Sequence, residues 1–126
     1  MDYSNKDTKI GFIGLGVMGK SMLSHLMRAG YSANIFTRTQ AKAVDFIEKG
    51  AHWKNSPGDV AKSSDVVITI VGYPTDVEEV YLGNDGILAN CKKGNTVVDM
   101  TTSSPELAVS IYNAAKEREI EALDAP

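Results

Sequence analysis

Short apolar runs alternate along this chain with stretches in which apolar residues recur every three or four positions. The apolar runs span Ile10–Ile13, Ser32–Phe36, Ala51–Trp53, Asp65–Val71, Thr96–Asp99 and Ile120–Leu123. Runs of this length that are rich in β-branched residues are typical of strands buried on both faces of a parallel sheet. We therefore expect each run to form a strand, and the nearly continuous run at Asp65–Val71 to be central.

Helical spacing fills the intervals between the strands. Met18, Met22, Leu26 and Ala29 repeat with the period of a helix over residues 17–29, and Gly30 is suited to end it. Further helices are predicted at residues 39–50, 56–62, 73–81 and 104–119. Two of these begin with Ser-Pro, in which serine caps the helix and proline occupies its first turn.

This alternation predicts an α/β protein with a doubly wound, Rossmann-type parallel sheet of about six strands. We expect residues 9–126 to form this domain. Residues 1–8 are polar and lack the apolar core of a signal peptide, so we expect a short disordered lead-in there. The sequence contains no internal repeat, low-complexity stretch or linker.

Composition narrows the classes of partner. The 126 residues suit one domain, and 43% hydrophobic with 23% charged residues is ordinary for a globular protein. The net charge of −3 argues against nucleic acid as the main partner, and no apolar run approaches the length that spans a membrane. One cysteine rules out an internal disulfide, which fits a reducing compartment; we expect the cytoplasm.

Few side chains in the sequence are candidates for catalysis or metal binding. We expect His25 to lie on a helix face, His52 to pack beside Trp53, and Cys91 to be an inert surface thiol. There is no cluster of metal ligands, so no metal site is predicted.

The glycines at the first strand-to-helix junction form the pattern G-x-G-x-x-G. Gly14 permits a tight turn off the strand, Gly16 lets the backbone approach a pyrophosphate, and Gly19 allows close packing of helix on strand. The free N–H groups at the helix start would face the phosphates. Glycines also mark ordinary turns. Here, however, dinucleotide binding is favoured by the strand before the glycines, the helix after them and a second strand at the expected distance.

The end of the second predicted strand bears on which dinucleotide binds. NAD sites usually place Asp or Glu about 20 residues past the glycines, to bind the ribose 2′-hydroxyl. Here Thr37, Arg38 and Thr39 follow Phe36, and Lys42 lies one turn further on. Arg38 can stack on adenine or bind a 2′-phosphate through two N–H groups, so we predict NADP, with NAD less favoured. The alternative is that Arg38 is a solvated charge beside a helix start.

Several segments together resemble a known family. They are Gly14–Met22, Asp65–Ile70, Gly83–Leu88, Asp99–Pro105 and the closing Leu123–Pro126. In combination they are similar to the N-terminal domain of the β-hydroxyacid dehydrogenases, which include 3-hydroxyisobutyrate dehydrogenase, tartronate semialdehyde reductase and glyoxylate/succinic semialdehyde reductase. The resemblance covers the chain from Lys9 onward.

The resemblance implies further cofactor contacts. Leu15, Val17 and Met18 would lie along the pyrophosphate with the three glycines. Val71 and Gly72 would pass beneath the adenosine and its ribose, at a place where the family usually has Leu-Pro. This departure leaves the local geometry open.

The resemblance also implies a substrate segment at Asp99-Met100-Thr101-Thr102, which matches the family's D-x-S-T. Thr101 stands where serine is usual, and its hydroxyl would bind a substrate carboxylate. Thr102 would lie near the nicotinamide ribose. A strand end followed by a helix cap is the plainer interpretation, although ligands bind at the carboxyl ends of strands in this fold.

The family's catalytic lysine lies on a helix of a second domain, and its S-G-G loop follows Asp-Ala-Pro. Neither is in this sequence, so the resemblance implies that the catalytic C-terminal helical domain is absent and that no catalytic residue can be assigned here. The chain would be the cofactor-binding domain of an NADP-dependent oxidoreductase, moving hydride between nicotinamide and a small β-hydroxyacid or semialdehyde. We expect this part alone to be inactive and the full-length protein to be a homo-oligomer.

Other functions stay open. The N-terminal domain of 6-phosphogluconate dehydrogenase shares the glycine loop with its Val-Met-Gly and the arginine after the second strand. A non-catalytic nucleotide-sensing module could be complete at about this length. A methyltransferase with a similar glycine loop would need an acidic residue at the position of Thr37 to bind a ribose, and this sequence has none there.

Overall fold

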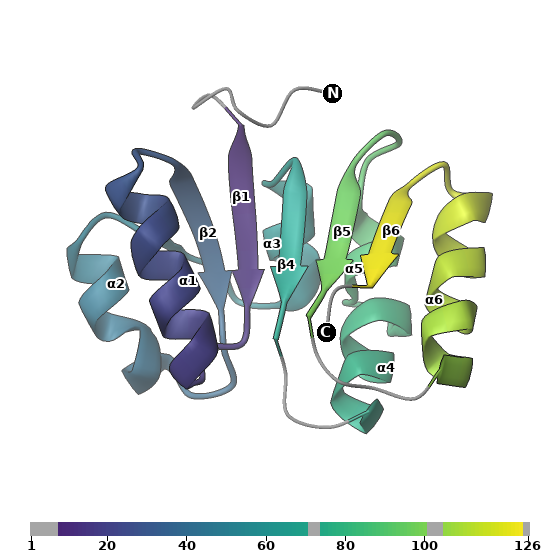
Figure 1. The fold of residues 1–126 in the computed structure, drawn as a ribbon, viewed down its shortest axis with the longest axis horizontal. Helices are drawn as coiled ribbons and strands as arrows, with labels where there is room; N and C mark the ends of the chain where they lie inside the picture. Colours follow the sequence, from purple (N-terminus) through teal and green to yellow (C-terminus); the bar gives the residue numbers. More distant parts are fainter. Residues whose placement is uncertain (1–7, 71–73, 101–104, 125–126) are drawn as a thin grey trace.

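A parallel six-stranded sheet forms the centre of the computed structural model, with strand order β3-β2-β1-β4-β5-β6 (Figure 1). The structure describes residues 8–70, 74–100 and 105–124. The strands are β1 (Lys9–Ile13), β2 (Ser32–Phe36), β3 (His52–Trp53), β4 (Val66–Thr69), β5 (Thr96–Asp99) and β6 (Glu121–Asp124). The strand order reverses between β1 and β4, and this switch point is where open α/β sheets bind ligands.

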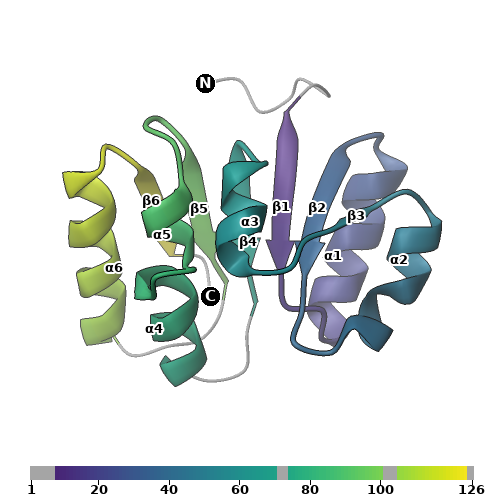
Figure 2. The ribbon, with the colours of Figure 1, turned by 180° about the vertical axis from the view of Figure 1, so that it is seen from behind.

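Helices cover both faces of the sheet (Figures 1 and 2). They are α1 (Val17–Arg28), the 3-10 helix η1 (Gln40–Ala43), α2 (Val44–Glu48), α3 (Pro57–Lys62), α4 (Pro74–Leu82), α5 (Ile87–Asn90) and α6 (Pro105–Glu117). α1 and α2 lie on one face, and α3, α4, α5 and α6 lie on the other. This is the doubly wound arrangement that the sequence predicts, and the Rossmann-type fold class is confirmed.

Adjacent residues of β1 belong to two different cores. Phe12 packs with Leu23 and Phe46 on the α1 face, whereas Ile13 packs with Val67 and Tyr81 on the α3 face. Phe12, Leu23, Val67 and Tyr81 are fully buried. The alternation of strand side chains thus fixes the central strand between the two helical layers, and with it the position of the turn that follows Ile13.

One part of the sheet surface extends from the edge of the α1-side core, against which Ile68 packs, to β6. Ile68 pairs with Val98, and Val98 pairs with Leu123, so these three side chains lie in a row across β4, β5 and β6. Ile68 and Val98 are half-buried and Leu123 is 49% exposed. No described helix lies in front of this half of the sheet in Figure 1.

The elements differ from the expected ones mainly at their ends. The helix predicted from Thr39 begins as η1 and becomes α-helical only at Val44, and the strand predicted over residues 65–71 is the shorter β4. The four-residue α5 was not predicted. Helix α3 starts as expected, because Ser56 Oγ accepts a hydrogen bond from Asp59 N–H (3.1 Å) and Pro57 follows the cap.

Two further expectations about single residues are corrected. His52 is exposed rather than packed; the aromatic partner of Trp53 is Phe36, with ring centroids 5.7 Å apart. Of the predicted lead-in at residues 1–8, only Thr8 lies within the described part, and it is buried directly before β1. The cap predicted at Ser104 lies outside the described residues.

Candidate functional site

The turn after β1 is built on a glycine conformation. Gly14 has a φ of 94°, in the left-handed region that other residues rarely adopt. Its N–H donates to the carbonyl of Phe36 at the end of β2 (3.0 Å). The turn is therefore tied to the neighbouring strand and leads directly into α1.

Gly16 and Gly19 have different surroundings. A Cβ placed on Gly19 would lie 2.5 Å from Gly14 O and 3.3 Å from Phe12 Cε1, so only glycine lets α1 pack this closely against the turn. A Cβ on Gly16 would meet no atom within 4 Å. Gly16 is the N-cap of α1, and no side chain caps the helix there. The backbone at Gly16 consequently has open space before a 12-residue helix whose first turn carries no acidic residue.

This geometry fits a diphosphate. A helix start offers N–H groups without internal partners and the positive end of the helix dipole, both of which favour an anion. Leu15 is buried in the α1-side core, so it can offer only its backbone to a ligand. Val17 and Met18 lie in the first turn of α1. The structure thus brings the predicted residues 14–19 together at one helix start.

The end of β2 borders a cavity of about 430 Å³. Arg38 lines it, and Phe36, Pro57 and Val80 give it an apolar part. The remaining lining residues are Glu79, Gly83, Asn84 and Asp85. An apolar recess beside an arginine, at the carboxyl end of the sheet, has the chemistry to hold an adenosine.

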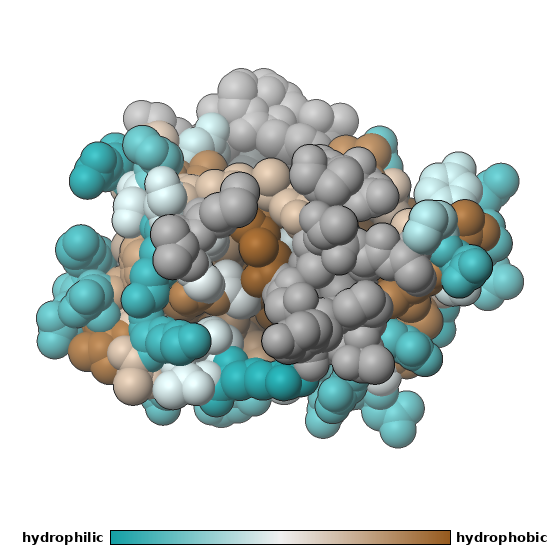
Figure 3. Space-filling model, turned by 60° about the horizontal axis from the view of Figure 1, so that its bottom comes forward, coloured by the Kyte–Doolittle hydropathy of each residue, from teal (hydrophilic) through white to brown (hydrophobic). Residues whose placement is uncertain are grey.

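The other residues predicted at this place have unequal exposure. Thr37 is buried, with 9% of its surface exposed, whereas Thr39 and Lys42 are exposed. Figure 3 shows the end of the molecule to which the strands point: apolar atoms are visible near its centre, with polar residues around the rim. A second cavity, of about 420 Å³, is lined by the first residues of β2 and so lies at the opposite end of the sheet.

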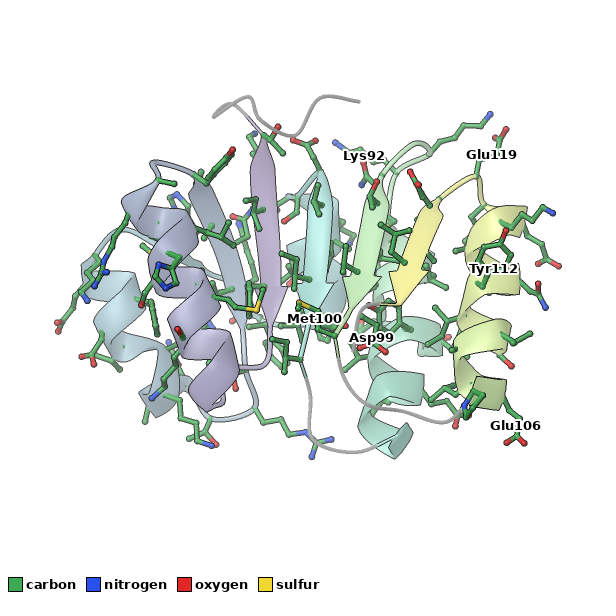
Figure 4. The ribbon with its side chains drawn as sticks, viewed as in Figure 1. Lys92, Asp99, Met100, Glu106, Tyr112 and Glu119 are labelled. Carbon is green, nitrogen blue, oxygen red and sulfur yellow. The ribbon has the colours of Figure 1, made fainter. Side chains whose placement is uncertain are left out.

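A buried polar cluster lies where β4 and β5 end. Thr69 Oγ1 is 3.1 Å from Asp99 Oδ1 and 2.7 Å from the hydroxyl of Tyr81 on α4. Asp99 and Met100 lie at the lower end of β5 in Figure 4. Sequence reasoning named Asp99 as part of a motif but missed Thr69 and Tyr81. The one available signal was a threonine near the carboxyl end of an otherwise apolar run.

Four predicted site residues lie outside the described part of the chain: Val71, Gly72, Thr101 and Thr102. Within the described ranges, no three metal-ligating side chains come together, and no helix is long and apolar enough to cross a bilayer. His25 is exposed on α1, and Cys91 is half-buried after α5.

Comparison with known proteins agrees with this geometry. The family model described as the NAD binding domain of 6-phosphogluconate dehydrogenase matches residues 9–126. An uncharacterized oxidoreductase of Bacillus subtilis is 56% identical over 93% of the chain, which covers 41% of that protein. A probable 3-hydroxyisobutyrate dehydrogenase-like protein, described as mitochondrial, of Arabidopsis thaliana is 50% identical over 95% of the chain and 36% of its own length.

A solved structure of a dehydrogenase is also similar to this chain over most of its length. The 3-hydroxyisobutyrate dehydrogenase of Mycobacterium tuberculosis, in a structure whose name includes L-serine, superposes with a TM-score of 0.84 at 28% identity. The match covers 94% of the chain and 40% of that protein. The chain therefore spans about two-fifths of the length of these three relatives.

Proposed function

Because the chain belongs to the family of the NAD binding domain of 6-phosphogluconate dehydrogenase, with hydroxyacid dehydrogenases among its relatives, we propose that it is the cofactor-binding half of an NADP-dependent oxidoreductase. The whole enzyme would move a hydride between nicotinamide and a small β-hydroxyacid or semialdehyde. Residues 9–126 would be the cofactor domain, and the rest of the enzyme would complete the substrate pocket. We place this enzyme in the cytoplasm, as a homo-oligomer.

The chain's own contribution is to bind and orient. The amides at residues 14–19 would hold the pyrophosphate in the space in front of Gly16, where a Cβ would meet no other atom. The recess beside Arg38 would take the adenosine. When bound, the nicotinamide supplies the carbon that gives or accepts the hydride. Thr101 would bind the substrate carboxylate, and Thr102 would lie near the nicotinamide ribose.

The position of Arg38 is the observation on which we base the preference for NADP over NAD. Arg38 lines the cavity at the end of β2, and residues 37–42 contain no acid that could bind a ribose 2′-hydroxyl. A hydrogen bond between charged groups contributes roughly 1.5–3 kcal/mol. That range corresponds to about a 10- to 100-fold preference for the cofactor with the extra phosphate. Glu79 and Asp85 line the same cavity and would lower this preference.

Calorimetric titration of the chain with NADPH and NADH tests the proposal. We expect wild type to bind NADPH about 10- to 100-fold more tightly, and Arg38→Ala to lose most of this preference while keeping its NADH affinity. Arg28→Ala is the matched control, because Arg28 is an exposed arginine in the last turn of α1, at the other end of the sheet. Equal wild-type affinity for both cofactors would contradict the NADP assignment, as would an unchanged NADPH affinity in Arg38→Ala. Absence of binding by either would remove the proposed function itself.

The cofactor domain of 6-phosphogluconate dehydrogenase is the second candidate, favoured by the description of the matching family model. The two candidates share the glycine turn and the arginine after β2. They differ in substrate, which the whole enzyme selects. Assays of the full-length parent protein with sugar phosphates and with semialdehydes separate them.

A further inference from the structure

The recess at the end of β2 is lined by charges of both signs, which come from different elements. Arg38 follows β2, whereas Glu79 lies in the last turn of α4 and Asp85 in the loop between α4 and α5. Both carboxylates are exposed. Figure 2 shows α4 and the chain after β2 at the same end of the molecule. Among the described residues that line the recess, Arg38 is the one cationic side chain.

The loop that carries Asp85 is fixed by hydrogen bonds to the helices on either side of it. The carbonyl of Asp85 accepts a hydrogen bond from the N–H of Gly58 at the start of α3 (2.6 Å). Asn90, at the end of α5, donates through Nδ2 to the carbonyl of Gly86 (2.8 Å). The N–H of Gly86 donates in turn to the carbonyl of Gly83 (2.9 Å). The backbone of Asp85 is therefore held beside the recess.

Close packing holds the same loop in place. A Cβ on Gly58 would lie 2.8 Å from Asp85 O, and a Cβ on Gly86 would lie 2.7 Å from Gly83 O, so neither position has space for a side chain. The next residue, Ile87, is fully buried in the core on the α3 face. Because the loop backbone is fixed in this way, we expect Asp85 to stay at the recess when a ligand enters it.

The charges in the recess act in opposite senses on a phosphate bound there. A phosphate monoester carries a charge of about −1.5 to −2 at neutral pH. Arg38 attracts such a group, whereas the carboxylates of Glu79 and Asp85 repel it. NADH has a neutral hydroxyl in place of the 2′-phosphate, so the same carboxylates affect its binding less. Because these side chains are exposed to water, each effect is modest and depends on the salt concentration.

We propose that Glu79 and Asp85 are specificity-determining residues, which limit the preference for NADPH that Arg38 provides. They place a second determinant of cofactor choice on α4 and the loop after it, far along the chain from the end of β2. The inference rests on the proposed function, which assigns the adenosine and its 2′-phosphate to this recess. It concerns the ratio of the two cofactor affinities and assigns no catalytic step to either residue.

Calorimetric titration of the chain with NADPH and NADH at low salt tests this inference. Glu79→Gln and Asp85→Asn each remove one charge with little change of shape. Each variant should bind NADPH about two- to fivefold more tightly than wild type, with NADH affinity changed less than about twofold. The double variant should combine the two gains. Glu117→Gln is the matched control and should leave the ratio unchanged, because Glu117 is an exposed acid at the end of α6, beside the far edge of the sheet.

The salt dependence gives a readout that a change of shape would not move. The Debye length falls from about 30 Å at 0.01 M salt to about 3 Å at 1 M salt. The gain in NADPH affinity of the double variant over wild type should therefore shrink to less than about twofold at 1 M salt. A gain that persists undiminished at this salt concentration would overturn the inference, because repulsion between charges could not be its cause.

The remaining outcomes separate this inference from the proposed function. An unchanged affinity ratio in the double variant would overturn the inference and leave the proposed function intact. Weaker NADH binding with unchanged NADPH binding would also overturn it, because the carboxylates would then bind the ribose 2′-hydroxyl instead of repelling the phosphate. If wild type binds both cofactors equally, the NADP assignment fails, and the change of the ratio in the double variant still decides this inference. Failure of wild type to bind either cofactor would remove the proposed function, and this inference with it.

Discussion

Cys91 is a half-buried thiol directly after α5. Burial raises the pKa of this thiol to about 11, against an ordinary value of 9.0, and a hydrogen bond with Asn95 partly opposes the shift. Because the thiolate is the reactive form, we expect the native chain to react about 100-fold more slowly with a thiol reagent at pH 8 than the urea-unfolded chain. Measured rates between pH 7 and 10 check this. The sequence expectation of an inert thiol thus stays a prediction, whereas its placement on the surface was only partly right.

The same shift has a consequence for stability. A thiol whose pKa is raised by folding keeps its proton in the native state after the unfolded chain has lost its own. Its stabilising contribution is therefore complete below about pH 9 and falls as the pH rises towards 11. Urea unfolding of wild type and Cys91→Ala at pH 8 and pH 10 separates the contribution of the Cys91 thiol to the free energy of unfolding from that of titrating lysines and tyrosines. Parallel losses of stability in both proteins would contradict it.

Single residues of the site differed in how far the sequence could reveal them. The three glycines and Arg38 could be named because their roles depend on local order: strand, turn, helix, next strand. Thr69 and Tyr81 could not, because their hydrogen bonds join residues 12 and 30 positions apart. A single sequence reveals only spacing along the chain, and contacts of that kind depend on which strands become neighbours.

The unit of β1, turn and α1 allows a prediction at the level of elements. Gly16→Ala should fold normally, since a Cβ there meets no atom within 4 Å and the backbone φ of −75° suits alanine. The same Cβ would occupy the space proposed for the pyrophosphate, so we expect cofactor affinity to fall about tenfold or more. Gly19→Ala should instead lower the free energy of unfolding by about 1–3 kcal/mol, because its Cβ meets the backbone oxygen of Gly14.

Urea unfolding and calorimetric titration of both variants separate the two effects. Gly50→Ala is an informative third variant: it also has open space around its Cβ, but its φ of 109° makes alanine strained there, far from the proposed phosphate site. It should lose stability and keep cofactor affinity. A Gly16→Ala chain that binds NADPH as tightly as wild type would argue against a pyrophosphate at this helix start.

Strands with a clear apolar run and helices with strong periodicity were predicted well, whereas the shortest helix was missed. The bounds of β2 were predicted to the residue, and α1 ends one residue before the prediction. Helix α5 has only four residues, too few for a periodic signal to emerge. The helix expected from Thr39 starts as a 3-10 turn whose last residue, Ala43, packs in the same core as Phe46 and Ile47 of α2. Tertiary packing, which is invisible in the sequence, decides such ends.

At the level of the whole molecule, the strand order follows from general rules. Alternating strands and helices with right-handed crossovers leave few arrangements for six strands, and the observed order β3-β2-β1-β4-β5-β6 is the doubly wound one. The unbroken apolar run around β4 predicts burial on both faces, yet Ile68 remains half-buried beside Val98 and the exposed Leu123. The sequence predicts the apolar character of this face, but the extent of its burial depends on tertiary packing, which spacing along the chain does not reveal.

The last prediction concerns cofactor binding, which we assign to this chain, and turnover, which we assign to the whole proposed enzyme. The 126-residue chain should bind NADPH but oxidise or reduce no substrate at a measurable steady-state rate, because the resemblance places the proton-transferring lysine in a second domain. Absorbance of the reduced nicotinamide, followed with 3-hydroxyisobutyrate and with small semialdehydes, checks this, once fluorescence has shown that the cofactor is bound. The full-length 3-hydroxyisobutyrate dehydrogenase of Mycobacterium tuberculosis, 28% identical in this region, is the positive control. Turnover by the short chain at a comparable rate would mean that its own residues complete a catalytic site, and the proposed division would be wrong.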